Sequence, residues 1–189
     1  MKCLPLLSFL LLTAVVSSAE PAKTNPAAPQ DLRVLSVNFE PAAQSPKPPK
    51  LKVVKADSEE TGGEEGQAAN AVDGNTNSIW HTQWQDESPA CPHEIILELS
   101  EATAIKGFTY LPRQDDSDHG GIKEYEFSVS DDGKDFGKPV KTGEFSAGKE
   151  MKTVAFDGKK CRFIKLRALS EINGEPWTSA AEIGIVLAD

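Results

Sequence analysis

The sequence has 189 residues, of which 39% are hydrophobic, so it can form the core of one ordinary domain but not of several. Twenty Lys and Arg residues stand against 29 Asp and Glu residues, which gives a formal net charge of -9. So acidic a surface repels nucleic acid, and three cysteines are too few for a cysteine-rich scaffold or zinc module.

An apolar run at the N-terminus predicts an export signal. Lys2 is the only charge before Glu20, and the mostly apolar residues 4–16 are followed by the small residues 17–19. This run is shorter than the about 20 residues of a membrane-spanning helix, although an uncleaved anchor is the alternative. We expect residues 1–19 to be a signal peptide cleaved after about Ala19, which makes the product secreted or periplasmic.

The segment 20–50 has the composition of an extended linker. It contains seven prolines, Pro21, Pro26, Pro29, Pro41, Pro46, Pro48 and Pro49. A short apolar segment within this linker, residues 32–39, fits either a short strand or a docking segment. We predict that the folded domain follows, over residues 51–189.

From residue 51 onward, apolar and polar residues alternate in short segments. Tyr125 and Phe127, for example, alternate with Glu124 and Glu126. The other segments with this pattern are 94–99, 154–156, 163–168 and 183–187. A period of two predicts half-buried antiparallel strands, and only residues 67–72 fit a helical turn. About eight strands with so little helix predict an all-β sandwich.

Cys91 and Cys161 remain after the predicted cleavage. In an oxidising compartment they form either a disulfide that closes a long loop, worth about 4 kcal/mol in the chain-entropy model, or two separate buried thiols. The sequence leaves both alternatives open.

Residues 70–78 are rich in oxygen donors around the Asp73-Gly74 turn. Ca²⁺ takes six to eight oxygen ligands, so one distant acid would have to complete such a site, and Glu182 in the C-terminal strand is the candidate. A solvated Asn/Asp turn is the alternative, and spacing alone favours it.

Two indoles flank a histidine in residues 80–84. A sugar needs an aromatic face for its C–H patch and polar groups for its hydroxyls, and His81 and Trp84 supply both. Trp80 follows Ile79 and is expected in the core. Arg113 follows a strand, where it can bind ligand hydroxyls or form an ion pair with a nearby acid.

Catalytic motifs are not apparent. The histidines are scattered at positions 81, 93 and 119, with no zinc-protease helix and no nucleophile elbow. Cys91-Pro92-His93 leads directly into a strand, which argues against a Cys/His nucleophile. We therefore expect a non-catalytic domain.

Five ordered motifs carry a family resemblance from about Leu51 to the C-terminus. They are Ala69-Asn70-Ala71-Val72-Asp73-Gly74, Trp80-His81-Thr82-Gln83-Trp84, Pro92-His93-Glu94-Ile95, Gly107 to Gln114 and Asn173 to Ile183. Together they resemble the coagulation factor 5/8 type C (discoidin-like) domain, in its bacterial family 32 carbohydrate-binding form.

The resemblance implies an eight-stranded antiparallel jelly-roll with a structural Ca²⁺. The implied ligands are side chains of Asp73, Ser78 and Glu182, with carbonyls near Asn70 and Asn75 and of Ala181. The implied sugar-binding residues are His81, Trp84 and Arg113, with Glu64 as the nearest match to a further acid. A second aromatic that relatives carry near that acid is missing from residues 62–66.

We therefore expect a secreted, non-catalytic module that binds terminal galactose or a related sugar. The alternative is an adhesion module of the discoidin class that recognises protein or membrane surfaces without sugar specificity. Loops rich in Asp, Gly and Gln argue against membrane insertion.

Overall fold

The structure is a computed structural model, and it describes residues 48–189. Within them lie the 3₁₀ turn η1 (Ala68–Val72) and the strands β1 (Leu51–Ala56), β2 (Trp80–His81), β3 (His93–Leu111), β4 (Glu124–Ser130), β5 (Lys141–Glu144), β6 (Lys152–Ala168), β7 (Ser179–Ala180) and β8 (Glu182–Leu187). The predicted all-β class and the single helical turn are confirmed. The signal peptide, its cleavage after Ala19 and the apolar segment 32–39 lie outside the described residues and stay predictions.

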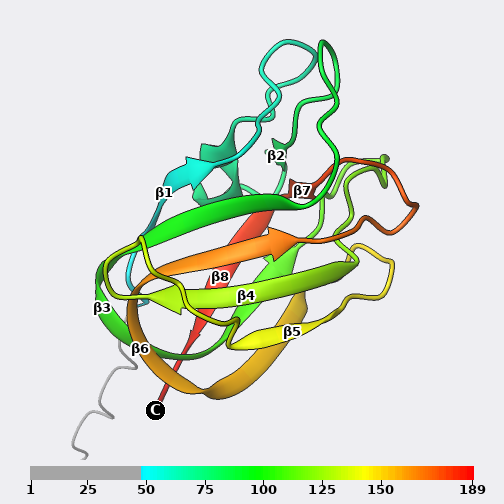
Figure 1. Ribbon diagram of the computed structural model, residues 1–189. Coiled ribbons are helices and arrows are strands. Elements are labelled where there is room, and N and C mark those ends of the chain that lie inside the picture. Colours follow the sequence, from blue (N-terminus) through cyan, green and yellow to red (C-terminus); the bar gives the residue numbers. More distant parts are fainter. Residues whose placement is uncertain (1–47) are drawn as a thin grey trace, which may run out of the picture. The chain divides into compact units, whose positions relative to one another are not determined.

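Two long bent strands connect the layers of an antiparallel β-sandwich (Figure 1). The larger sheet has the order β1-β3-β6-β4-β5, with β8 also paired to β3, and a small second sheet joins β2 to β7. The register of β3 against β6 shifts between Glu98 and Thr103. The first half of β3 pairs with β1 and the second half with β8.

Alternating side chains of the strands form the core, as the sequence pattern predicts. Tyr125 and Phe127 of β4 point inward, and Phe127 stacks on Phe108 of β3 with ring centroids 4.2 Å apart. Trp80 is 1% exposed, which confirms its predicted place in the core. Burial of each large apolar side chain contributes roughly 1.5–3 kcal/mol to stability.

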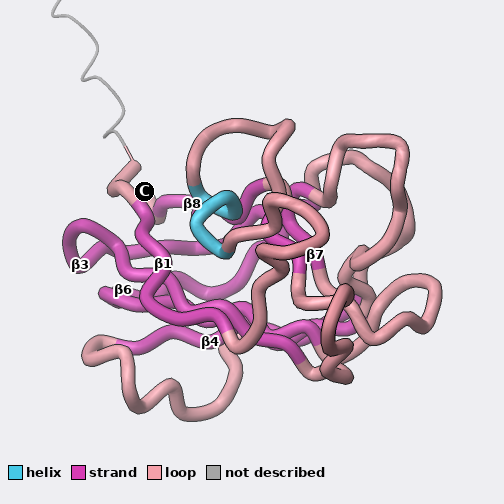
Figure 2. Tube along the Cα trace, turned by 90° about the horizontal axis from the view of Figure 1, so that it is seen from above, coloured by secondary structure: helices cyan, strands magenta, loops and turns pink. Residues whose placement is uncertain are grey.

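Most of the long loops lie on the side of the molecule where β7 lies (Figure 2). The short β2–β7 ladder places His81 opposite Ser179, so loops about a hundred residues apart in sequence meet there. Between residues 48 and 189 no helix has the length and apolar composition that crossing a membrane requires.

Candidate functional site

A hollow of about 310 Å³ opens among these loops. Its walls are formed by Glu64, His81, Trp84, Arg113, Ser117, His119 and Trp177. The hollow therefore brings together all four residues that the sequence analysis proposed for ligand binding, from three separate segments of the chain. It also adds three residues that the sequence analysis did not propose for this site.

Glu64 connects three of the walls. Its Oε1 accepts a hydrogen bond of 2.9 Å from Nε1 of Trp84 and lies 3.6 Å from Nδ1 of His81. Its Oε2 lies 3.7 Å from Nη2 of Arg113. One carboxylate thus orients an indole and lies within reach of an imidazole and a guanidinium.

Trp84 presents its ring to solvent at the hollow. The residue is 39% exposed, in contrast to the buried Trp80. Gly63 lies directly against the ring, because a Cβ on that glycine would come within 2.5 Å of Trp84 Cζ2. A side chain at position 63 would therefore collide with the indole, which excludes the missing aromatic from that one position.

His81 is buried at the floor of the hollow. Its Nδ1 lies 2.6 Å from the Thr82 carbonyl oxygen, which can only accept, so Nδ1 carries the proton. Burial lowers the pKa of His81 below its ordinary value, although the Thr82 carbonyl and the Glu64 charge oppose this. In the neutral ring Nε2 is therefore an acceptor, suited to a hydroxyl donor.

Arg113 is held by an acid of its own loop. Its Nε and Nη2 donate to Oδ1 and Oδ2 of Asp115 at 2.7 and 2.6 Å. The bond from Arg113 lowers the pKa of Asp115, so the pair stays charged. The sequence analysis expected Arg113 either to bind a ligand or to form an ion pair, and the structure shows the ion pair with Asp115. Among the described residues no hydrogen-bond partner contacts Nη1, so this nitrogen is free to bind a ligand.

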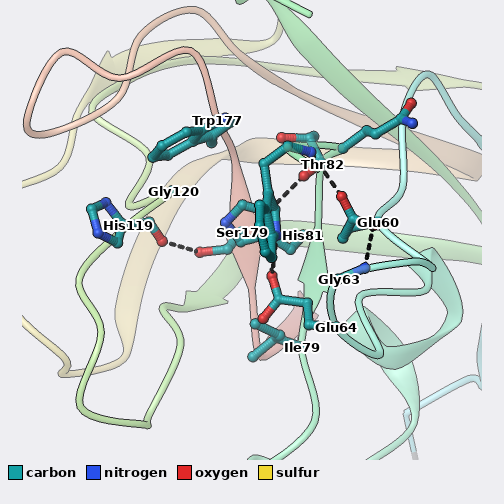
Figure 3. A network of polar contacts seen from close by, with 12 residues as sticks. Glu60, Gly63, Glu64, Ile79, His81, Thr82, His119, Gly120, Trp177 and Ser179 are labelled. Atoms are coloured by element: carbon teal, nitrogen blue, oxygen red, sulfur yellow. Dashed lines mark hydrogen bonds and ion pairs between the residues drawn. The ribbon is translucent and has the colours of Figure 1, made fainter. Parts of the chain in front are cut away.

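Trp177 and His119 form the wall that the sequence analysis missed. Their rings meet edge to face with centroids 5.3 Å apart, and Trp177 lies 6.3 Å from the His81 ring (Figure 3). Trp177 Nε1 donates to Ser88 Oγ at 2.8 Å. Trp177 precedes β7 in the sequence, and this position could have indicated that it lies near His81. The position is informative only when the pairing of β7 with β2 is known.

A second group of polar residues lies at the Asp73-Gly74 turn. Ser78 Oγ donates to Asp73 Oδ2 at 2.7 Å and lies 2.8 Å from the Asn75 carbonyl oxygen. Glu182, at the start of β8, accepts a 2.7 Å bond from the Gly74 amide. Burial raises the pKa of Glu182, and the nearby Asp73 charge raises it further.

These residues fit a hard cation in their chemistry. Two carboxylates approach each other from distant parts of the chain, with a hydroxyl and a carbonyl oxygen beside them, and Ca²⁺ prefers such oxygen donors. Asn70 contributes differently, because its Nδ2 donates to the carbonyls of Glu65 and Ile79 and fixes the loop. In residues 48–189 no group of three or more His, Cys, Asp or Glu side chains is arranged so that it could hold a metal ion, so carbonyls would have to complete the ligand set.

Both remaining cysteines are free thiols. Cys161 is buried, and burial raises its pKa to about 11. Cys91 is partly buried beside the Pro176 carbonyl. Of the two alternatives that the sequence left open, the structure shows separate thiols, and the disulfide is not formed.

Comparisons with known proteins agree on one family. The family model of the F5/8 type C domain matches residues 53–183. Galactose oxidase from Gibberella zeae is 35% identical over 136 residues, which are 71% of this chain and 20% of that protein. Sialidase from Micromonospora viridifaciens is 34% identical over 137 residues, which are 72% of this chain and 21% of that protein. The chain thus spans about a fifth of the length of these relatives.

The chain also resembles solved structures of single modules over nearly their whole length. CpGH89CBM32-5 from Clostridium perfringens, in complex with GalNAc-β-1,3-galactose, has a TM-score of 0.66 and 36% identity, covering 72% of this chain and 95% of that one. The family 32 CBM of C. perfringens NanJ, in complex with galactose, has a TM-score of 0.63 and 29% identity, covering 72% and 93%.

Proposed function

The chain belongs to the F5/8 type C domain family, and from that premise we propose that residues 51–189 act as a non-catalytic carbohydrate-binding module for terminal galactose or a related sugar. The observation that carries the proposal is the hollow itself, where Trp84 exposes an aromatic face beside His81, Arg113 and Glu64. The sugar complexes of the two C. perfringens modules support it.

Each wall would make a different kind of contact. Trp84 stacks on the apolar C–H face of the sugar, and Nε2 of His81 accepts a bond from a hydroxyl. Nη1 of Arg113 donates to a neighbouring hydroxyl, while Asp115 holds the guanidinium in place. Each bond replaces one to water and gains only about 1 kcal/mol, so a few contacts give a Kd on the order of 0.1–1 mM.

We also propose a structural Ca²⁺ at the Asp73-Gly74 turn. Side chains of Asp73, Ser78 and Glu182 would hold it, with carbonyls of Asn70, Asn75 and Ala181. When bound, the cation neutralises the two carboxylates and links the turn to the start of β8. This site does not line the sugar hollow, so its contribution is to stability.

Titration calorimetry with galactose, lactose and GalNAc tests the proposal. Trp84→Ala should weaken binding about tenfold or more, because it removes the stacking face. Met151→Ala is the matched control, since Met151 is also exposed and apolar but does not line the hollow. Wild-type protein that binds none of these sugars, yet floats with liposomes or retains a protein partner, would instead favour the adhesion alternative.

A further inference from the structure

Two buried glutamates next to the hollow have no cationic partner. Glu60 and Glu171 are each 2% exposed, and none of the ion pairs among residues 48–189 includes either of them. A buried carboxylate is costly unless donors surround it. In both cases most of the donors are main-chain amides of loops, and Nδ2 of Asn173 adds a longer bond of 3.5 Å to Oε1 of Glu171.

Glu60 joins the loop that carries Glu64 to the loop that carries Trp84. Its Oε1 accepts from the amides of Gly62 and Gly63 at 2.7 and 2.8 Å. Its Oε2 accepts from the amides of Trp84 and Gln85 at 2.8 and 2.9 Å. These bonds, that of Trp84 first, lower the pKa of Glu60 to about 2, so it stays charged at neutral pH.

The loop contacts around Glu60 determine where the Trp84 ring lies. Gly63, which bonds to Glu60, packs against that ring, and Glu64 accepts the bond from the indole nitrogen. The side chain of Glu60 does not line the hollow itself. Its influence on a ligand would therefore pass through Glu64 and Trp84.

Glu171 makes the corresponding connection on the opposite wall. Its Oε1 accepts from the Gly120 amide at 3.2 Å, and its Oε2 accepts from the amides of Asn173 and Glu175. Gly120 follows His119, and the turn at 173–175 leads to Trp177. Gly120 also has a φ of +81°, and its carbonyl oxygen accepts a bond of 2.7 Å from the Ser179 amide.

Figure 3 shows the two walls on either side of His81, with Trp177 and His119 on one side and Glu60 and Gly63 on the other. We propose that Glu60 and Glu171 are positioning residues, each holding one wall of the sugar hollow through main-chain amides, so that the two walls can be loosened independently. This inference rests on the proposed sugar-binding function. Glu60 would influence ligand affinity through Trp84 and Glu64. Glu171 would influence it through Trp177 and His119.

Glutamine substitutions test the two glutamates separately. Glu60→Gln and Glu171→Gln keep the side-chain size, but each replaces one acceptor oxygen with an NH₂ group that faces amide donors. Glu65→Gln is the matched control, because it removes the same charge from an exposed side chain of the Glu64 loop. Amide hydrogen exchange, sugar titration and the melting temperature are measured for each variant with the complete chain.

In Glu60→Gln, we expect exchange at Gly62, Gly63, Trp84 and Gln85 to speed up by a factor that is about tenfold or more larger than at the strand amides. Sugar Kd should rise about tenfold. In Glu171→Gln, the faster amides should instead be Gly120, Asn173 and Glu175. Glu65→Gln should resemble the wild type in all three measurements.

Three outcomes would overturn the inference. The first is exchange that speeds up by the same factor at the named loop amides and throughout the sheet, which indicates a general structural role. The second is unchanged exchange at the named amides, and the third is freed amides with unchanged sugar affinity. A wild type that binds no sugar contradicts the proposed function instead, and the exchange pattern then decides the positioning roles by itself.

Discussion

Glu60 and Glu182 are two carboxylates near loops, and they are satisfied in opposite ways. Glu60 accepts four main-chain amides, which lower its pKa to about 2. Glu182 accepts the Gly74 amide and lies near the charge of Asp73, and burial together with that charge raises its pKa. The oxygens of Glu60 have all their hydrogen-bond donors within the protein, whereas Glu182, among the described residues, accepts one hydrogen bond and lies beside a second negative charge.

The difference indicates which carboxylates are suited to a cation. Donors that surround Glu60 leave no lone pair directed at an ion, so a metal there would have to displace main-chain hydrogen bonds. The turn with Asp73 and Ser78 instead gathers oxygens that a cation can share. The hollow proposed to bind sugar is thus organised by protein hydrogen bonds, and the Asp73 turn is proposed to be organised by Ca²⁺.

Calcium should produce the largest effect. At a concentration a hundredfold above its Kd, a bound ion stabilises the fold by about 2.7 kcal/mol, which raises the melting temperature by roughly 10 °C. Glu182→Gln should remove this calcium dependence, while Glu101→Gln, an exposed control, should retain it. Scanning calorimetry with CaCl₂ and with EDTA measures the shift, and identical melting in both would exclude the site.

Acid should weaken the Glu60 contacts by a smaller amount. The pKa of Glu60 is about 2 in the folded state against an ordinary value of 4.5, so its stabilisation is fully present above pH 4.5 and is lost as pH falls toward 2. Denaturant unfolding should find Glu60→Gln less stable than wild type by about 2 kcal/mol at pH 7. That gap should shrink as the pH is lowered from 4.5 to 2.5. A gap independent of pH would show that the charge of Glu60 contributes nothing.

Ser78→Ala should have the smallest effect and separates the two regions most sharply. It removes the hydroxyl that bonds to Asp73 Oδ2, so calcium affinity should fall about fivefold, equivalent to about 1 kcal/mol. Sugar affinity should stay within about twofold of wild type, because Ser78 does not line the hollow. Calorimetric titrations with each ligand make the comparison. An equal loss of both affinities would mean that the two regions are coupled.

Local patterns predicted much of the fold and part of the site. The alternation around Tyr125 and Phe127 identified a strand whose inner face is buried, and the run at 67–72 identified the single helical turn. The family motifs placed His81, Trp84 and Arg113 together, and the structure brings them to one hollow. The sequence did not decide whether Arg113 binds a ligand or an acid. Asp115, two residues away, can form an ion pair that competes with a ligand for the guanidinium.

The sequence by itself determined the strand segments in which apolar and polar residues alternate, the buried Trp80 and the polar turn around Asp73, because each depends on side-chain character over a few neighbouring residues. Only the tertiary structure decided that Trp177 faces His81 and that the four amides converge on Glu60. Such contacts follow from strand pairing between distant segments, as in β2 with β7. A period of two along one strand carries no information about which loop the other end of the sheet brings beside it.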